Sequence, residues 1–130
     1  MVEQAQSNEP HGKLTIRIVA MPADTNPSGD IFGGWVLSQM DIAGGVAAVQ
    51  VTKTRVVTVG VNAMTFIAPV KVGDVLCVYT DIIKIGKTSI TIAIEAWARR
   101  DRMAIREKVT EGHFTYVALD DGGKKCVIEQ

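Results

Sequence analysis

Hydrophobic and polar residues follow two different periods along this chain, and the change of period divides it into elements. The segment IFGGWVLSQMDIAGGVAAVQV, residues 31–51, is about 20 residues long, which is too long for an ordinary strand. Its apolar residues recur at helical spacing and lie nearly all round the helix, a pattern that predicts a buried helix. The recurring positions include Trp35, Val36, Met40, Ala43 and Ala47.

Most of the remaining chain alternates with the period of two that is typical of strands. A short strand is expected within residues 13–21, where Leu14, Ile16 and Ile18 alternate with Thr15, Arg17 and Val19. Connections of hairpin size that contain Pro or Gly separate several of the later segments. The longer strands that follow the helix are expected within residues 55–70, 74–83, 88–98 and 108–119.

The order of these elements predicts an α+β fold, with one buried helix laid on one face of an antiparallel sheet. We expect a single domain over residues 13–120, a flexible N-terminal tail over 1–12 and a polar C-terminal tail over 121–130. The helix covers only one sheet face, so the other apolar faces and the apolar back of the helix need a partner. The pattern therefore predicts an oligomer.

Composition excludes several classes of protein. Fourteen basic residues balance fourteen acidic ones, so no global field attracts nucleic acid or a membrane surface. Four glycines and one Asp make residues 31–51 a poor membrane span. Cys77 and Cys126 lie far apart, which argues against a disulfide framework or a zinc site and fits a reducing cytosol. The polar, acidic N-terminus is no signal peptide, and we expect a cytoplasmic protein.

Asp41 is the one charged residue of the apolar segment, and this makes it a candidate catalytic acid. A buried structural acid held by backbone donors and a helix residue that faces solvent are the alternatives. Burial would raise the pKa of such a carboxyl and nearby N–H donors would lower it. The residue pattern alone leaves these alternatives open.

The stretch NPSGDIFGG, just before the helix, offers the parts of an oxyanion site. Asn26 supplies an amide, and Gly33 lies where unpaired helix N–H groups favour developing negative charge. A plain glycine-rich turn is the alternative. Gly33 and Asp41 are eight residues apart, about 12 Å along one helix. If both are catalytic, Gly33 must therefore act with Asp41 from a second subunit.

The other candidate functional residues in this sequence have weaker support. The GKTS stretch lacks the rest of a P-loop, but as a hairpin it offers Gly86, Lys87 and Ser89 to a phosphate. We expect His113 to be a strand residue rather than a catalyst, because no second His or Cys stands near it in the sequence to form a relay. No HExxH motif or Cys/His cluster is present, so neither a metal nor another cofactor is expected.

Three stretches together resemble the hotdog-fold acyl-CoA thioesterases of the YciA type. They are MPADTNPSGDIFGGWVLSQMDIAGG, TVGVNAMTFIAPVKVGDVL and KIGKTSITIAIEAWAR, and the similarity covers roughly residues 13–118. The resemblance implies a long helix wrapped by a curved antiparallel sheet. It also implies a dimer with one continuous sheet, assembly of three such dimers into a hexamer, and hydrolysis of acyl-CoA to a free acid and CoA without a metal.

By motif position, the resemblance places the family's catalytic acid on Asp41, its loop amide on Asn26 and its oxyanion N–H donor on Gly33. Some relatives carry a hydroxyl one helical turn beyond the acid, where this chain has Gly45. A hotdog dehydratase is one alternative, but such enzymes typically use a His, and residues 31–51 contain none. A non-catalytic acyl-CoA-binding regulator is another. It would be expected to carry a DNA-binding extension, for which a 12-residue tail is too short.

Overall fold

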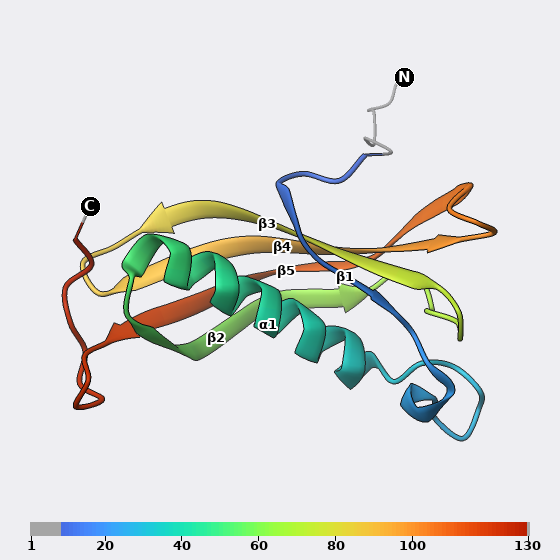
Figure 1. Ribbon diagram of the computed structural model, residues 1–130, viewed down its shortest axis with the longest axis horizontal. Coiled ribbons are helices and arrows are strands. Elements are labelled where there is room, and N and C mark those ends of the chain that lie inside the picture. Colours follow the sequence, from blue (N-terminus) through green and yellow to red (C-terminus); the bar gives the residue numbers. More distant parts are fainter. Residues whose placement is uncertain (1–8, 130) are drawn as a thin grey trace.

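One long helix lies across one face of a five-stranded antiparallel sheet (Figure 1). The computed structural model describes residues 9–129, except for the side chain of residue 63. The α+β hotdog architecture predicted from the sequence is confirmed. The elements are β1 (Lys13–Val19), a 3-10 turn (Pro22–Asp24), α1 (Gly33–Thr52), β2 (Arg55–Phe66), β3 (Val75–Ile85), β4 (Ser89–Arg100) and β5 (Ile105–Leu119).

The sheet has the strand order β1-β3-β4-β5-β2, and every neighbouring pair is antiparallel. Strands β3, β4 and β5 follow one another through hairpins. The helix instead connects β1 and β2, which form the two edges of the sheet. Strand β2 presents Val57, Val59 and Val61 as exposed apolar side chains. An edge strand of this kind is open to pairing with another chain.

The core lies between the concave face of the sheet and one side of α1. Alternate residues of β4, Ile90, Ile92 and Ile94, are fully buried there, as period two predicts. From the helix, Val36 and Met40 pack into the same cluster. Burial of an aliphatic side chain of this size contributes about 1.5–3 kcal/mol. This contact fixes which side of α1 faces the sheet.

The opposite side of α1 is apolar and exposed in the single chain. Its exposed apolar side chains are Leu37, Ile42, Val46 and Val49. The all-round apolar pattern of the sequence therefore has two parts, one buried in the core of this subunit and one left uncovered by it. Within the described residues, no helix is long and apolar enough to cross a membrane.

Both ends of the described chain contact the sheet. The backbone N–H of His11 donates to Glu95 on β4, although the sequence places His11 in a tail. At the other end, Ile128 is only 4% exposed and its N–H donates to the carbonyl oxygen of Lys87. Three apolar residues, 126–128, after a polar run are too few to show a period, which is why the sequence did not predict this contact. The predicted tail residues 1–8 and 130 lie outside the described residues.

Candidate active site

The Asp41 carboxylate lies in the middle of α1 and is held by two hydroxyl groups from the sheet. Thr58 Oγ1 donates to Asp41 Oδ1 at 2.7 Å, and Tyr116 Oη lies 3.1 Å from the same oxygen. Tyr116 Oη is also 2.9 Å from the main-chain oxygen of Asp41. Thr58 and Tyr116 are paired across β2 and β5. Among residues 9–129, no hydrogen-bond partner reaches Asp41 Oδ2.

Tyr116 is a buried phenol, only 1% exposed. Burial raises the pKa of Tyr116 well above its usual value, and the neighbouring Asp41 carboxylate raises it further. The phenol therefore keeps its proton at neutral pH and donates it to Asp41. The Tyr116 hydroxyl is thus a neutral hydrogen-bond donor to a partly buried carboxylate.

Gly44 leaves the space that the Tyr116 hydroxyl occupies. A Cβ atom on Gly44 would lie 2.0 Å from Tyr116 Oη and 2.7 Å from Ile94 Cδ1. Gly44 is thus a point of close packing between the helix and side chains of the sheet. A Cβ on Gly45 would meet nothing within 4 Å in this subunit.

Asn26 organises the loop that leads into α1. Its Oδ1 accepts the N–H groups of Ser28 at 2.9 Å and Asp30 at 3.1 Å. Two N–H donors fix that atom as the oxygen, so Nδ2 is the part of the amide that remains to donate outward. The Asp30 carboxylate also pairs with Lys71 at 2.6 Å, which ties the loop to the segment before β3.

The N-terminus of α1 lacks a side-chain cap, because Phe32 occupies the N-cap position. The first N–H groups of the helix, including that of Gly33, have no acceptor within the helix. They carry the positive end of the helix dipole. A donor of this kind suits an oxyanion or a polarised carbonyl oxygen.

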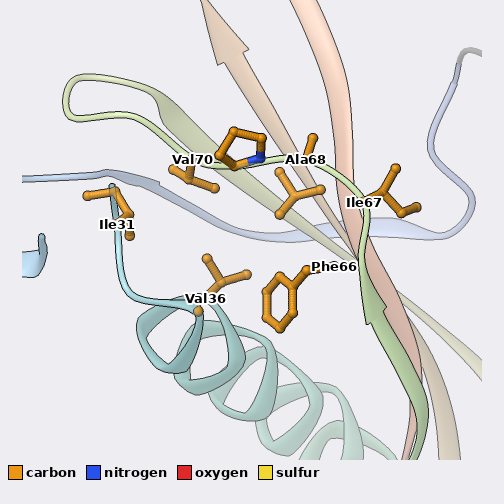
Figure 2. A pocket seen from close by; sticks show the side chains of 9 residues that line it. Ile31, Val36, Phe66, Ile67, Ala68 and Val70 are labelled. Atoms are coloured by element: carbon orange, nitrogen blue, oxygen red, sulfur yellow. The ribbon is translucent and has the colours of Figure 1, made fainter. Parts of the chain in front are cut away.

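An apolar cavity of about 350 Å³ lies beside Gly33 (Figure 2). Val36 of α1 and Phe66 at the end of β2 border it, and a Cβ on Gly33 would lie 3.3 Å from the Phe66 ring. The segment after β2 forms the remaining wall. The lining residues are Ile31, Gly33, Val36, Phe66, Ile67, Ala68, Pro69, Val70 and Val109.

The helix is continuous from Gly33 to Thr52, so Gly33 and Asp41 are separated by about 12 Å of rise in one subunit. The structure brings Asp41 together with Thr58 and Tyr116, and Gly33 together with the apolar cavity. It does not bring Gly33 and Asp41 to one centre within the chain.

Comparison with known proteins places this arrangement in a family. The family model described as the thioesterase superfamily matches residues 28–105, a range that includes Gly33, Asp41 and Thr58. The acyl-CoA thioester hydrolase YciA of Salmonella typhimurium is 52% identical over 120 residues, which are 90% of each chain. The chain belongs to the hotdog-fold acyl-CoA thioesterases of the YciA type.

Two solved structures resemble the thioesterase over nearly its whole length. The hexameric thioesterase y2039 of Yersinia pestis has 52% sequence identity and a TM-score of 0.88, with 94% of this chain and 99% of that chain covered. HI0827, described as a hexameric broad-specificity acyl-coenzyme A thioesterase, has 44% identity and a TM-score of 0.89. Its comparison covers 94% of this chain and 84% of that one.

The three residues that the sequence offers to CoA phosphates lie in the β3–β4 hairpin of the thioesterase. Gly86 N–H donates to the carbonyl oxygen of Ser89 at 2.7 Å, so this N–H closes the hairpin instead of facing a ligand. The exposed Lys87 ammonium and the Ser89 hydroxyl are the remaining donors. The hairpin lies where α1 ends, at the opposite end of the helix from Gly33 (Figure 1).

Sequence reasoning missed Thr58, Tyr116 and the role of Gly44 in the thioesterase. Tyr116 shares the apolar face of its strand with Phe114 and Ala118, which already signalled burial of its hydroxyl. A buried hydroxyl requires a hydrogen-bond partner. That requirement could have pointed to the one carboxylate of the helix, whereas nothing in the local sequence marked Thr58.

His113 lies on the outer face of the sheet, away from Asp41. It is exposed on β5 and borders a second, polar cavity of about 370 Å³. In that cavity, Glu95 accepts hydrogen bonds from His11 N–H at 3.3 Å and from Trp97 Nε1 at 2.9 Å. Residues 9–129 bring together no group of three His, Cys, Asp or Glu side chains that could hold a metal ion.

Proposed function

We propose that this chain hydrolyses the thioester of acyl-CoA to a carboxylic acid and CoA, with Asp41 as general base or nucleophile. The observation that supports this role is the state of its carboxylate. Oδ1 receives both hydroxyl contacts, from Thr58 and Tyr116, while Oδ2 has no partner among residues 9–129. An oriented carboxylate with one available oxygen suits proton abstraction from water.

Two reaction courses fit this geometry. In the first, Asp41 takes a proton from water while the water oxygen attacks the thioester carbon. The C–S bond then breaks, and the departing CoA thiolate takes up the proton held by Asp41. In the second, Oδ2 attacks the carbon itself, the thiolate leaves, and water cleaves the resulting mixed anhydride. Both courses place negative charge on the carbonyl oxygen.

The Gly33 N–H is proposed to stabilise that charge, assisted by the helix dipole. The Nδ2 group of Asn26 is proposed to orient the water or the thioester. The apolar cavity beside Gly33 supports binding of a carbon chain of the substrate, since no charged side chain is among its lining residues. Because Gly33 lies about 12 Å along the helix from Asp41 of its own chain, each site combines Gly33 of one subunit with Asp41 of another.

The uncovered apolar surface supports this shared site. It comprises the outer side of α1 and the exposed valines of β2, Val57, Val59 and Val61. Pairing of β2 edges would extend the sheet through a dimer and cover both surfaces. Since HI0827 and y2039 are described as hexameric, a hexamer built from three dimers is the proposed assembly. Lys87 and Ser89 are proposed to contact phosphates of CoA.

Asp41→Asn and Asp41→Ala test the assignment. Both variants should lose about 10²–10⁴-fold in turnover, because neither can accept the proton. Thiol release from a panel of acyl-CoAs measures this, after correction for the two free cysteines, Cys77 and Cys126. Asp81→Asn, an exposed aspartate on β3, is the matched control. Wild-type turnover in both Asp41 variants, as folded oligomers, would refute the role of Asp41.

Whether each site is built from two subunits is tested by combining two variants in one oligomer. Heterodimers that combine one Asp41→Asn subunit with one Asn26→Ala subunit contain one site with every proposed group intact. They should recover activity that neither homo-oligomer shows. No recovery in isolated heterodimers would contradict a site built from two subunits. No thiol release by the wild type from any acyl-CoA, with measurable CoA binding, would favour the non-catalytic regulator.

A further inference from the structure

We propose that Tyr116 is a positioning residue for the hydrolysis, which fixes the Asp41 carboxylate so that Oδ2 faces the reacting water or thioester, and that Gly44 reserves the space for its hydroxyl. The inference rests on the proposed function of Asp41. It concerns how that carboxylate is oriented.

The phenol oxygen contacts the backbone and the side chain of the same residue. Tyr116 Oη lies 2.9 Å from the main-chain oxygen of Asp41 and 3.1 Å from its Oδ1. The hydroxyl has one proton, and either acceptor that receives it belongs to Asp41. A proton shared between these two acceptors restrains the Asp41 side chain relative to the helix backbone.

Tyr116 and Thr58 approach Asp41 Oδ1 from different strands. Thr58 lies on the edge strand β2 and is exposed in the single chain, whereas Tyr116 lies on the inner strand β5 and is buried. The buried contact fixes the carboxylate from within the subunit, independently of how β2 pairs. With both hydroxyls on Oδ1, Oδ2 is the oxygen that remains for chemistry.

The side chains that contact this carboxylate are neutral. From β2 it meets the Thr58 hydroxyl and from β5 the Tyr116 phenol. Among residues 9–129, no ion pair involves Asp41. Hydrogen bonds to a carboxylate favour its charged form. The two hydroxyls thus supply that stabilisation, and burial keeps the phenol protonated as a donor.

Gly44 makes the contact sterically feasible. A Cβ there would lie 2.0 Å from the phenol oxygen and 2.7 Å from the ring carbon that bears it. No adjustment of a flexible side-chain end removes both clashes, because the ring itself is buried between helix and sheet. A helix position that accepts only glycine, three residues after the carboxylate, is what a phenol aimed at that carboxylate requires.

Tyr116→Phe is the first test, since it removes the hydroxyl and keeps the ring. Single-turnover rates should fall about 10- to 100-fold, as expected for loss of a hydrogen bond to a charged group, with substrate affinity changed less than about twofold. The acid limb of the pH–rate profile should move to higher pH, because the charged carboxylate loses a donor. Tyr79→Phe, on the other tyrosine of the chain, is the matched control and should change neither quantity.

A second variant covers the case in which Tyr116→Phe does not fold. In the Tyr79→Phe background, 3-fluorotyrosine incorporation alters Tyr116 alone and makes its phenol a stronger donor. The acid limb should then move to lower pH, a shift opposite in sign to that of Tyr116→Phe. If Tyr116 had a purely structural role, the acid limb would not shift in either variant.

The outcomes separate this inference from the proposed function. If Asp41→Asn is inactive but the Tyr116 variants that fold keep the wild-type rate and pH profile, Tyr116 does not position the carboxylate and the role of Asp41 stands. If Asp41→Asn keeps full turnover, the proposed function itself fails. Opposite shifts of the acid limb in the two Tyr116 variants would establish the positioning role.

Discussion

Gly44→Ala adds one methyl group at the point where α1 approaches β5 most closely. The new Cβ would meet Tyr116 Oη at 2.0 Å, Tyr116 Cζ at 2.7 Å and Ile94 Cδ1 at 2.7 Å. Real Cβ contacts are longer than any of these distances, so the helix must shift or the tyrosine must leave its place. Either response breaks the hydrogen bonds between Tyr116 and Asp41.

Three effects set the magnitude. Overpacking of a well-packed core costs about 1–3 kcal/mol. Loss of a hydrogen bond to a charged acceptor adds about 1.5–3 kcal/mol. Alanine is the better helix former by about 1 kcal/mol, which offsets part of the loss. We therefore expect Gly44→Ala to lower the free energy of unfolding by about 1.5–5 kcal/mol, with activity reduced at least as much as in Tyr116→Phe.

The assay is thermal unfolding at one fixed protein concentration, because the stability of an oligomer depends on concentration. For a chain of this size, each kcal/mol corresponds to a shift of about 3–5 °C in Tm. Gly45→Ala is the neighbouring control, since a Cβ there meets nothing within 4 Å in this subunit. A Gly44→Ala protein with unchanged Tm and unchanged single-turnover rate would show that Gly44 does not reserve space for Tyr116.

Two further predictions concern stability. Asp74→Ala removes a carboxylate that is 3% exposed and pairs with Arg100 at 2.7 Å. Because the Arg100 side chain is partly exposed, we expect the free energy of unfolding to fall by about 1–3 kcal/mol, which lowers Tm relative to the exposed-loop control Asp121→Ala. Equal Tm values for the two variants would contradict this. Tyr116 has a raised pKa in the folded protein, so its contribution is complete below the unfolded value of about 10 and is lost as pH rises above it, at up to about 1.4 kcal/mol per pH unit. Tm measured between about pH 9 and 11 should therefore fall less steeply in Tyr116→Phe than in the wild type, and parallel curves would refute this.

Local patterns predicted most of the fold. Alternation at Ile90, Ile92 and Ile94 identified a strand face that is fully buried, and helical spacing identified α1 within two residues of its observed start. These patterns work because burial imposes the period of each element on its own residues. The contact of Ile128 with the sheet has no such period and appeared only in the structure.

The candidate site was predicted in part. Asp41 stands out in the sequence because a charge in an apolar segment requires a reason, and Asn26 and Gly33 stand out through turn chemistry and position. The partners of Asp41 lie 17 and 75 residues away, on strands whose register depends on the whole sheet. No local pattern encodes that distance in the chain.

The sequence by itself determined the elements, the order in which they occur and the one carboxylate of the central helix, because each depends on the residues of a single segment. Only the tertiary structure decided which oxygen of Asp41 is held, by which hydroxyls, and why Gly44 and not Gly45 must lack a side chain. These features depend on distances of 2.7–3.1 Å between α1, β2 and β5. Such distances are set when the sheet packs against the helix, and hydrogen bonding is decided at that scale.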